Sequence, residues 1–270
     1  MDQCSGRSLG EVLDAMERVA VAVSGGVDSL TLAVFAHRRL GGRVEAFHAV
    51  SPAVPEDATA RVRLLAQREG WRLHVIDAHE FEDPNYRANP LERCFYCKTN
   101  LYSTIAPHTT AQIVSGTNLD DLGEYRPGLE AARRYSVRHP FVEAGLDKRA
   151  VRALARDLGL GEIAELPASP CLSSRIETGI TIDPKVLALV NRAERLIADV
   201  LAPQIVRCRV RANGVVIELD QARLAALDAG QREELGARIG ALFRGAGFDH
   251  EVSFAPYRVG SAFLHRATPV

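Results

Sequence analysis

The chain has 270 residues, 47% of them hydrophobic and 25% charged, and its formal net charge is −1. These proportions are typical of a globular protein with one or two domains, and a near-neutral chain offers nucleic acid or an anionic membrane no general positive field. No apolar run reaches the roughly 18 residues of a membrane span, and the polar first residues do not resemble a signal peptide. Five cysteines are few and odd in number, so we expect reduced thiols in a cytoplasmic protein.

A glycine-rich loop follows the first predicted strand. Residues 19–23 form a short apolar run that predicts a buried parallel strand. Next comes the sequence SGGVDS at 24–29, in which Gly25 and Gly26 allow backbone N–H groups to close on phosphate oxygens at the start of a helix. The loop is not a Walker A sequence, because no Gly-Lys-Ser/Thr follows it. The open alternative is an ordinary tight turn that caps the helix.

Strands and helices alternate through the first two-thirds of the chain. Further strands are predicted at 44–50, 71–76 and 111–115, and helices at 29–40, 56–69, 98–105 and 146–158. This alternation predicts an α/β fold with a doubly wound parallel sheet, whose ligands lie at the carboxyl ends of the strands.

The pattern changes beyond Pro170. Helices at 185–200 and 231–243, two antiparallel strands at 205–211 and 215–219 and a last strand at 251–254 predict a smaller C-terminal α+β domain. We place the two domains at 1–180 and 181–270, because the alternation of strand and helix ends near this point.

Three cysteines form a second pattern. Cys94 and Cys97 are three residues apart, a spacing that lets two thiols point at one metal, and Cys171 lies in a loop with two prolines. A single C-x-x-C also fits a redox pair, and three inert buried thiols fit as well. A structural zinc ion would need a fourth ligand, for which the chain offers His108, His139 or Cys208.

The loop at 24–29 resembles the SGGxDS loop of the PP-loop ATP pyrophosphatases, which have an adenine nucleotide alpha hydrolase-like fold. That resemblance implies that a substrate is adenylated and that pyrophosphate leaves. The motifs SGGVDS, RCFYCK-NLY, SGTNLDD, RPG and ASPCLSSR occur in this order. Together they resemble the LarE family of ATP-dependent sulfur transferases, which build the nickel-pincer nucleotide cofactor, over residues 19–182.

The LarE resemblance implies a source for the sulfur. In that family the cysteine that matches Cys171 is the sulfur donor, and some members sacrifice its sulfur and keep dehydroalanine. Other members have cysteines matching Cys94, Cys97 and Cys171 and are thought to hold a 4Fe-4S cluster. Three thiolates leave one iron without a protein ligand, where an extra sulfide can bind. We therefore expect the cluster-bearing variety, with a sulfide source that the sequence does not identify.

The resemblance also implies a reaction and a set of site residues. A pyridinium mononucleotide dicarboxylate attacks the α-phosphorus of Mg²⁺-bound ATP, and sulfur then replaces the AMP-activated oxygen to give a thiocarboxylate. Catalytic positions are Cys171, Asp28 and Arg175. ATP contacts fall at Ser24, Gly25, Gly26, Asp28, Ser29, Gly116, Asn118, Asp121 and Arg126, and substrate contacts at Arg175, Arg207, Arg209 and Glu218.

Several features limit the resemblance. Val216 stands where the family often has arginine, and residues 253–256 lack its usual acidic residues. Both departures lie in the predicted C-terminal domain and concern the substrate rather than the ATP chemistry. Cys4 and Cys208 lie outside the three-cysteine pattern and are expected to be spare thiols. The family tends to form homo-oligomers. Rival classes are a tRNA thiolase, which a neutral chain disfavours, an amide-forming ATP pyrophosphatase, and a nonenzymatic nucleotide-binding or cluster-carrying module.

Overall fold

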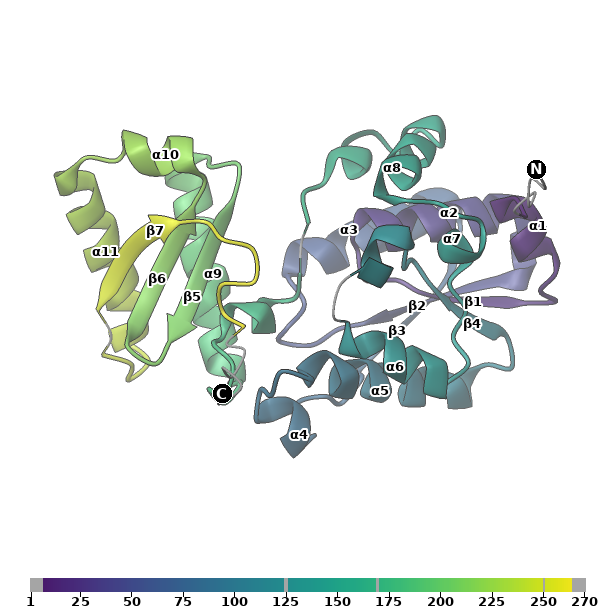
Figure 1. Cartoon of the computed structure of the whole chain (residues 1–270), viewed down its shortest axis with the longest axis horizontal. Helices are drawn as coiled ribbons and strands as arrows, with labels where there is room; N and C mark the ends of the chain where they lie inside the picture. The colour runs from purple at the N-terminus through teal and green to yellow at the C-terminus, as the bar shows by residue number, and fades with distance from the viewer. Residues whose placement is uncertain (1–6, 124–125, 169, 250, 264–270) are drawn as a thin grey trace, which may run out of the picture. The chain divides into compact units, whose positions relative to one another are not determined.

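The computed structural model describes residues 7–123, 126–168, 170–249 and 251–263 (Figure 1). Cys4 lies outside these ranges, as do residues 264–270 of the tail 263–270, for which the sequence predicts fraying. The chain divides into two compact units. The first unit contains Met1–Glu80 and Cys94–Ser169, and the second contains Phe81–Arg93 and Pro170–Val270. The sequence placed the boundary near residue 180 and gave no sign that a segment near residue 90 belongs to the second unit.

The first unit is built on a four-stranded sheet with the order β3-β2-β1-β4. All of its strands are parallel, and β1 pairs with β2 on one side and with β4 on the other. Val19 of β1 lies opposite Val44 and Gln112, and Ala22 lies opposite Phe47 and Ser115. The strands are β1 (Val19–Ala22), β2 (Val44–Ala49), β3 (Arg72–Ile76) and β4 (Gln112–Ser115).

Helices cover both faces of this sheet, which confirms the predicted α/β class (Figure 1). Val19 and Val21 pack with α2, α3 and α8 on one face, whereas Ala20 packs with α5 and α6 on the other. Alternate residues of β1 therefore enter two different cores, as expected for a strand that is buried on both sides. The helices are α1 (Leu9–Asp14), α2 (Val27–Leu40), α3 (Glu56–Glu69), α5 (Arg93–Ile105), α6 (Pro127–Arg134), α7 (Pro140–Glu143) and α8 (Lys148–Asp157).

Helix ends in this unit follow from local chemistry. Asp147 caps α8 by accepting a hydrogen bond from the backbone N–H of Ala150, and Gly70 ends α3 in the left-handed conformation with φ of 70°. The short 3₁₀ turns are Gly41–Arg43, Ala106–His108, Leu119–Gly123 and Gly161–Glu165. Helices α1, α6 and α7 are too short for a clear sequence period, so the sequence did not predict them.

The second unit has a three-stranded sheet with the order β5-β6-β7. Strands β5 and β6 are antiparallel, as predicted, and β7 runs parallel to β6. Its strands are β5 (Val206–Arg211), β6 (Gly214–Leu219) and β7 (Val252–Pro256). Its helices are α4 (Pro84–Arg87), α9 (Pro184–Leu201), α10 (Gln221–Ala226) and α11 (Ala229–Arg244), with a 3₁₀ turn at Leu172–Arg175.

The segment 81–93 is part of the second unit because its side chains bind there. The Tyr86 hydroxyl lies 2.6 Å from the Ser173 hydroxyl, and both groups are buried. The Asn89 amide donates to the carbonyl oxygens of Ile176, Glu177 and Ile180. These contacts join residues separated by more than 80 positions, which no local sequence pattern reveals.

Candidate active site

The SGGVDS loop connects β1 to α2 as predicted. The Ser29 hydroxyl accepts a hydrogen bond from the Ser24 N–H at 3.1 Å and donates to the Gly26 carbonyl at 3.2 Å. Gly26 is the N-cap residue of α2, and no side chain caps this helix end. The first N–H groups of α2 therefore keep their capacity to bind an anion, which the helix dipole also favours.

Gly25 is required by the geometry of this loop. Its φ is +85°, and a Cβ atom there would lie 2.8 Å from the Ala58 carbonyl oxygen of α3. Both conditions exclude other residues without a shift of the backbone. Gly25 therefore lets the loop pack closely against α3, in addition to the expected approach of the loop backbone to phosphate.

The loop after β4 lies directly against the SGGVDS loop. A Cβ atom on Gly116 would come within 2.7 Å of the Ser29 backbone nitrogen, so the two segments are in van der Waals contact. Because β1 and β4 are neighbouring parallel strands, both loops leave the carboxyl edge of the sheet. The prediction that Gly116 and Asn118 lie beside the SGGVDS loop is therefore consistent with the fold, and their contact with ATP stays a prediction.

Asp28 is held by a cation that the sequence analysis missed. The Lys148 Nζ atom lies 2.7 and 2.5 Å from the two carboxylate oxygens of Asp28, and the Asn118 amide nitrogen lies 3.4 Å from one of them. Both ion-pair partners are about one-third exposed, with side-chain exposures of 32% and 28%. In the sequence, Lys148 is only a lysine near the start of the helix predicted at 146–158. Its proximity to Asp28 is seen only in the folded structure.

Asp121 and Arg126 form a second ion pair in this region. The Arg126 guanidinium lies 2.8 Å from the Asp121 carboxylate, whose other oxygen accepts a hydrogen bond from the Asn118 N–H. Gly128, two residues beyond Arg126, packs on α5: a Cβ atom there would lie 3.0 Å from the Lys98 side chain and 3.6 Å from the Cys94 carbonyl oxygen. The RPG motif therefore links the loop after β4 to the helix that carries two cysteines.

The three cysteines of the pattern fall in different units. Cys94 and Cys97 are half-buried near the start of α5 in the first unit, and Cys171 is half-buried before the 3₁₀ turn of the second unit. In the part of the chain that the structure describes, no group of three or more His, Cys, Asp or Glu residues is arranged to hold a metal ion. One helix thus supplies two of the predicted ligands, and the 4Fe-4S cluster stays a prediction. Cys208 is fully buried, which raises the pKa of its thiol well above the ordinary value, as expected for an unreactive thiol.

Three buried arginines hold the backbone of the loop that carries Cys171. Arg175 donates to the carbonyl oxygens of Pro170 and Cys171, Arg93 donates to that of Ser173, and Arg209 donates to that of Ser174. These side chains are 2 to 4% exposed. The arrangement fixes the path of the loop while the Cys171 side chain stays partly accessible.

Carboxylates neutralise two of these arginines. Arg175 forms a two-point ion pair with Glu194, with distances of 2.9 and 3.0 Å, and Arg209 pairs with Glu218 at 3.0 Å. No observation tests the predicted substrate contacts of Arg175 and Arg209, and both guanidinium groups are engaged with carboxylates and with the loop backbone. Arg207 is less buried and stacks at 5.8 Å over the ring of Tyr257. Desolvation, followed by the nearby Arg175 charge, lowers the pKa of Arg207.

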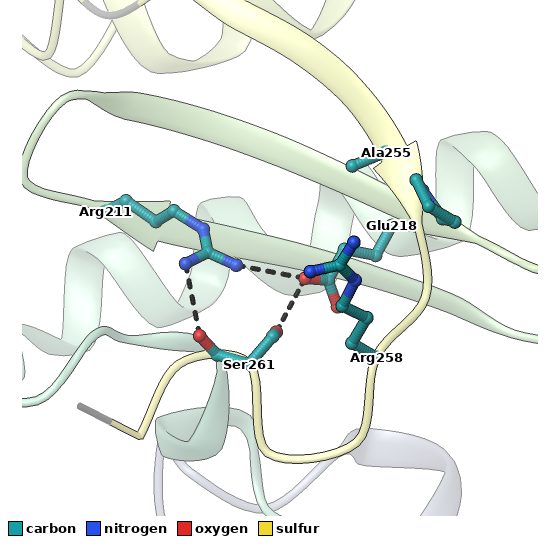
Figure 2. A pocket seen from close by; sticks show the side chains of 6 residues that line it. Arg211, Glu218, Ala255, Arg258 and Ser261 are labelled. Atoms are coloured by element: carbon teal, nitrogen blue, oxygen red, sulfur yellow. Dashed lines mark hydrogen bonds and ion pairs between the residues drawn. The ribbon is translucent and has the colours of Figure 1, made fainter. Parts of the chain in front are cut away.

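Glu218 also lines a pocket in the second unit (Figure 2). The pocket has a volume of about 380 Å³, and its polar lining comes from Arg211, Glu218, Arg258 and Ser261. Arg211 and the Ser261 hydroxyl both donate to one oxygen of Glu218, at 3.0 and 2.6 Å. Arg258 is exposed, and no acid of the described residues forms an ion pair with it. Arg258 lies in the sequence YRVGS at 257–261 and was not among the predicted site residues.

The parallel sheet, the SGGVDS loop after β1 and the uncapped start of α2 are consistent with a PP-loop-like domain. No family model matches the chain. It is 31% identical over 222 residues to the pyridinium-3,5-bisthiocarboxylic acid mononucleotide synthase of Lactiplantibacillus plantarum, covering 80% of each chain. This chain therefore belongs to the LarE family, of which that synthase is a member.

The chain is also similar to two other proteins. An uncharacterized protein of Synechocystis is 37% identical over 216 residues, which cover 78% of this chain and 80% of the relative. One subunit of the glutamine-hydrolyzing GMP synthase of Thermococcus kodakarensis is 28% identical over 207 residues, covering 67% of this chain and 64% of that relative. Within the described residues, none of the helices has the length and apolar character needed to cross a bilayer.

Proposed function

We propose that this protein is an ATP-dependent sulfur transferase that converts a carboxylate of a pyridinium mononucleotide into a thiocarboxylate. The observation that carries the proposal is the similarity over 80% of both chains to a pyridinium-3,5-bisthiocarboxylic acid mononucleotide synthase. The arrangement of the SGGVDS loop supports an ATP-using first step, and the held loop around Cys171 supports a sulfur-handling second step.

In the first step, a substrate carboxylate oxygen attacks the α-phosphorus of ATP. The bond from the α-phosphorus to the bridging oxygen breaks, and pyrophosphate leaves while an acyl adenylate forms. The N–H groups at the start of α2 and the Ser24 and Ser29 hydroxyls would stabilise the pyrophosphate charge. Asp28 would hold Mg²⁺, which prefers carboxylate and phosphate oxygens, once Lys148 moves from Asp28 to a phosphate oxygen.

In the second step, a sulfur nucleophile attacks the acyl carbon and AMP leaves with the carboxylate oxygen. A 4Fe-4S cluster bound by Cys94, Cys97 and Cys171 would supply a sulfide at the iron that lacks a protein ligand. Alternatively, the Cys171 thiolate attacks and forms a thioester. A base then removes the Cα proton of Cys171 and the C–S bond breaks, which gives the thiocarboxylate and leaves dehydroalanine. Two rounds would give a dithio product.

The substrate phosphate and carboxylates need cations near Cys171. Arg207 and Arg258 are the arginines we assign to this task, because Arg175 and Arg209 are buried in ion pairs with glutamates. Guanidinium groups bind such planar anions in two-point contacts. In this assignment Arg175, Arg209 and Glu218 position the loop and the pocket rather than contact the substrate.

The test incubates anaerobically purified protein with Mg²⁺, ATP and the pyridinium-3,5-dicarboxylate mononucleotide. We expect AMP and pyrophosphate in equal amounts and a product whose mass has gained one sulfur for each oxygen lost. Cys171→Ser should still release pyrophosphate but form no thiocarboxylate. Absence of AMP and pyrophosphate with active-site residues intact would refute the enzyme proposal, and a salt-sensitive shift of tRNA would favour a tRNA thiolase instead.

The sulfur source is resolved by two measurements on the same samples. Iron and acid-labile sulfide at about four atoms each per chain, both lost in Cys171→Ala, would support the cluster. No iron, together with loss of H₂S from the mass of the chain after turnover, would establish Cys171 as a sacrificial donor. One tightly bound zinc ion would show that the thiols are structural. Light scattering of the same protein tests the expected homo-oligomer.

A further inference from the structure

The outer side of the SGGVDS loop is braced by two side chains from neighbouring elements. Arg61 of α3 donates from Nη1 to the Gly25 carbonyl oxygen at 2.6 Å. His48 at the end of β2 lies with Nδ1 2.8 Å from the Val23 carbonyl oxygen and with Nε2 2.9 Å from the Thr59 hydroxyl. A carbonyl only accepts hydrogen bonds, so Nδ1 of His48 carries the proton and Nε2 of the neutral ring accepts from Thr59.

These two contacts fix two peptide groups of the loop. In a trans peptide the carbonyl and the N–H point in opposite directions. The peptide between Val23 and Ser24 is held at both ends, since its carbonyl binds His48 and its N–H binds Ser29. The peptide between Gly25 and Gly26 is held at its carbonyl by Arg61, and no acceptor for the Gly26 N–H is found among the described residues.

The free N–H therefore lies on the side of the peptide away from Arg61. Gly26 is the N-cap residue of α2, so its N–H joins the first N–H groups of that helix. Glycine peptides rotate more easily than others, and an unfixed Gly25–Gly26 peptide would rotate and place its carbonyl where an anion has to bind. A fixed donor avoids this reorganisation when the anion arrives.

We propose that Arg61 is a positioning residue for the nucleotide: it holds the Gly25–Gly26 peptide so that the Gly26 N–H is available to the β,γ-diphosphate of ATP and to the departing pyrophosphate. His48, whose ring is oriented by the Thr59 hydroxyl, fixes the Val23–Ser24 peptide of the same loop. The inference rests on the proposed function, because it requires that the SGGVDS loop binds these phosphates.

A purely structural explanation of Arg61 fits less well. The face of α3 that packs in the core consists of Ala58, Val62, Leu65 and Ala66, and Arg61 is only half-buried beside it. No carboxylate of the described residues pairs with Arg61. Among the residues that the structure describes, its one hydrogen-bond partner is the Gly25 carbonyl, so its contribution is directed at the loop.

The experiment measures binding of Mg²⁺-pyrophosphate, Mg²⁺-ATP and AMP to the full chain by calorimetry. Arg61→Met removes the donor and keeps the side-chain length, Arg61→Lys keeps one cationic donor, and Arg63→Met changes an exposed arginine of the same helix. We expect Arg61→Met to weaken pyrophosphate and ATP binding about tenfold, the loss typical of one charge-assisted hydrogen bond. AMP lacks the β,γ-diphosphate, so its affinity should not change. Arg61→Lys should recover part of the loss, and Arg63→Met should match the wild type.

Unchanged pyrophosphate affinity in Arg61→Met would overturn the inference, as would an equal loss of AMP affinity or an equal effect of Arg63→Met. If Arg61→Met does not fold, the test uses Arg61→Lys instead. A pyrophosphate affinity of Arg61→Lys below that of the wild type, with unchanged AMP affinity, supports the inference. Wild-type affinity for both ligands refutes it. A wild-type chain that binds neither ATP nor pyrophosphate would refute the proposed function, and with it this inference.

Discussion

Glu194 supports the loop of Cys171 from a buried position, and its removal is expected to be costly. The side chains of Glu194 and Arg175 are 12% and 3% exposed, so water replaces little of a lost contact. Glu194 accepts two hydrogen bonds from Arg175 and a third from the Cys208 N–H at 2.9 Å. Glu194→Ala leaves the Arg175 charge buried without its carboxylate, in a region where Arg207 already adds a like charge. We expect the unfolding free energy of the second unit to fall by about 3–5 kcal/mol.

Native-state hydrogen exchange on peptides from β5 and β6 measures this free energy within the second unit. Glu234→Ala is the matched control, because Glu234 and Arg238 of the same unit form an exposed pair with N···O of 3.8 Å and side-chain exposures of 72% and 47%. That change should cost less than about 1 kcal/mol. Glu194→Ala should also change the alkylation rate of Cys171, since Arg175 holds the Cys171 carbonyl. A loss no larger than that of Glu234→Ala would refute the idea that the buried pair holds the loop.

Three further predictions concern the first unit. Gly25→Ala places a Cβ atom 2.8 Å from the Ala58 carbonyl oxygen, at a backbone φ of +85°. Because the loop has to shift, calorimetry should show pyrophosphate binding that is at least about tenfold weaker. Wild-type pyrophosphate affinity would contradict this prediction. Lys148→Met removes a partly exposed ion pair with Asp28, so the free energy of unfolding should change by less than about 1 kcal/mol. Release of pyrophosphate from ATP in the proposed reaction should become slower. A variant that unfolds instead would show that the pair is structural. Burial lowers the pKa of His48, so below about pH 6.5 the unfolded chain binds a proton that the folded ring does not, and stability falls. In urea titrations His48→Gln should lose this part of the acid sensitivity; an unchanged difference between neutral and acidic midpoints would argue against it.

The sequence was sufficient for the parallel sheet because its signals are local. The apolar run before the SGGVDS loop forms β1, and the loop takes the predicted position between β1 and α2. The predicted antiparallel pair in the second unit also forms, as β5 and β6. The short helices α1, α6 and α7 were missed, because a helix of about two turns or fewer has too few residues to show a period.

The site was less predictable because its decisive contacts are distant in the chain. Lys148 reaches Asp28 across 120 positions and Arg61 reaches Gly25 across 36. Arg207 and Arg209 alternate on β5, yet Arg209 is buried against Glu218 while Arg207 is only half-buried. Residue type and spacing identified cations for an anionic substrate, but only the fold shows which guanidinium groups are held in buried ion pairs.

The composition of the second unit from two separate stretches has a consequence for biosynthesis. Residues 81–93 leave the ribosome long before Ser173 and Ile176, to which Tyr86 and Asn89 bind. Until then Tyr86, which is 1% exposed in the finished structure, lacks the Ser173 hydroxyl that it contacts there. Loop closure over this separation slows the pairing, while an exposed apolar segment invites aggregation during synthesis. We expect any chain truncated before residue 170 to leave residues 81–93 without the surface on which they pack. Truncation at one position therefore does not yield the first unit alone.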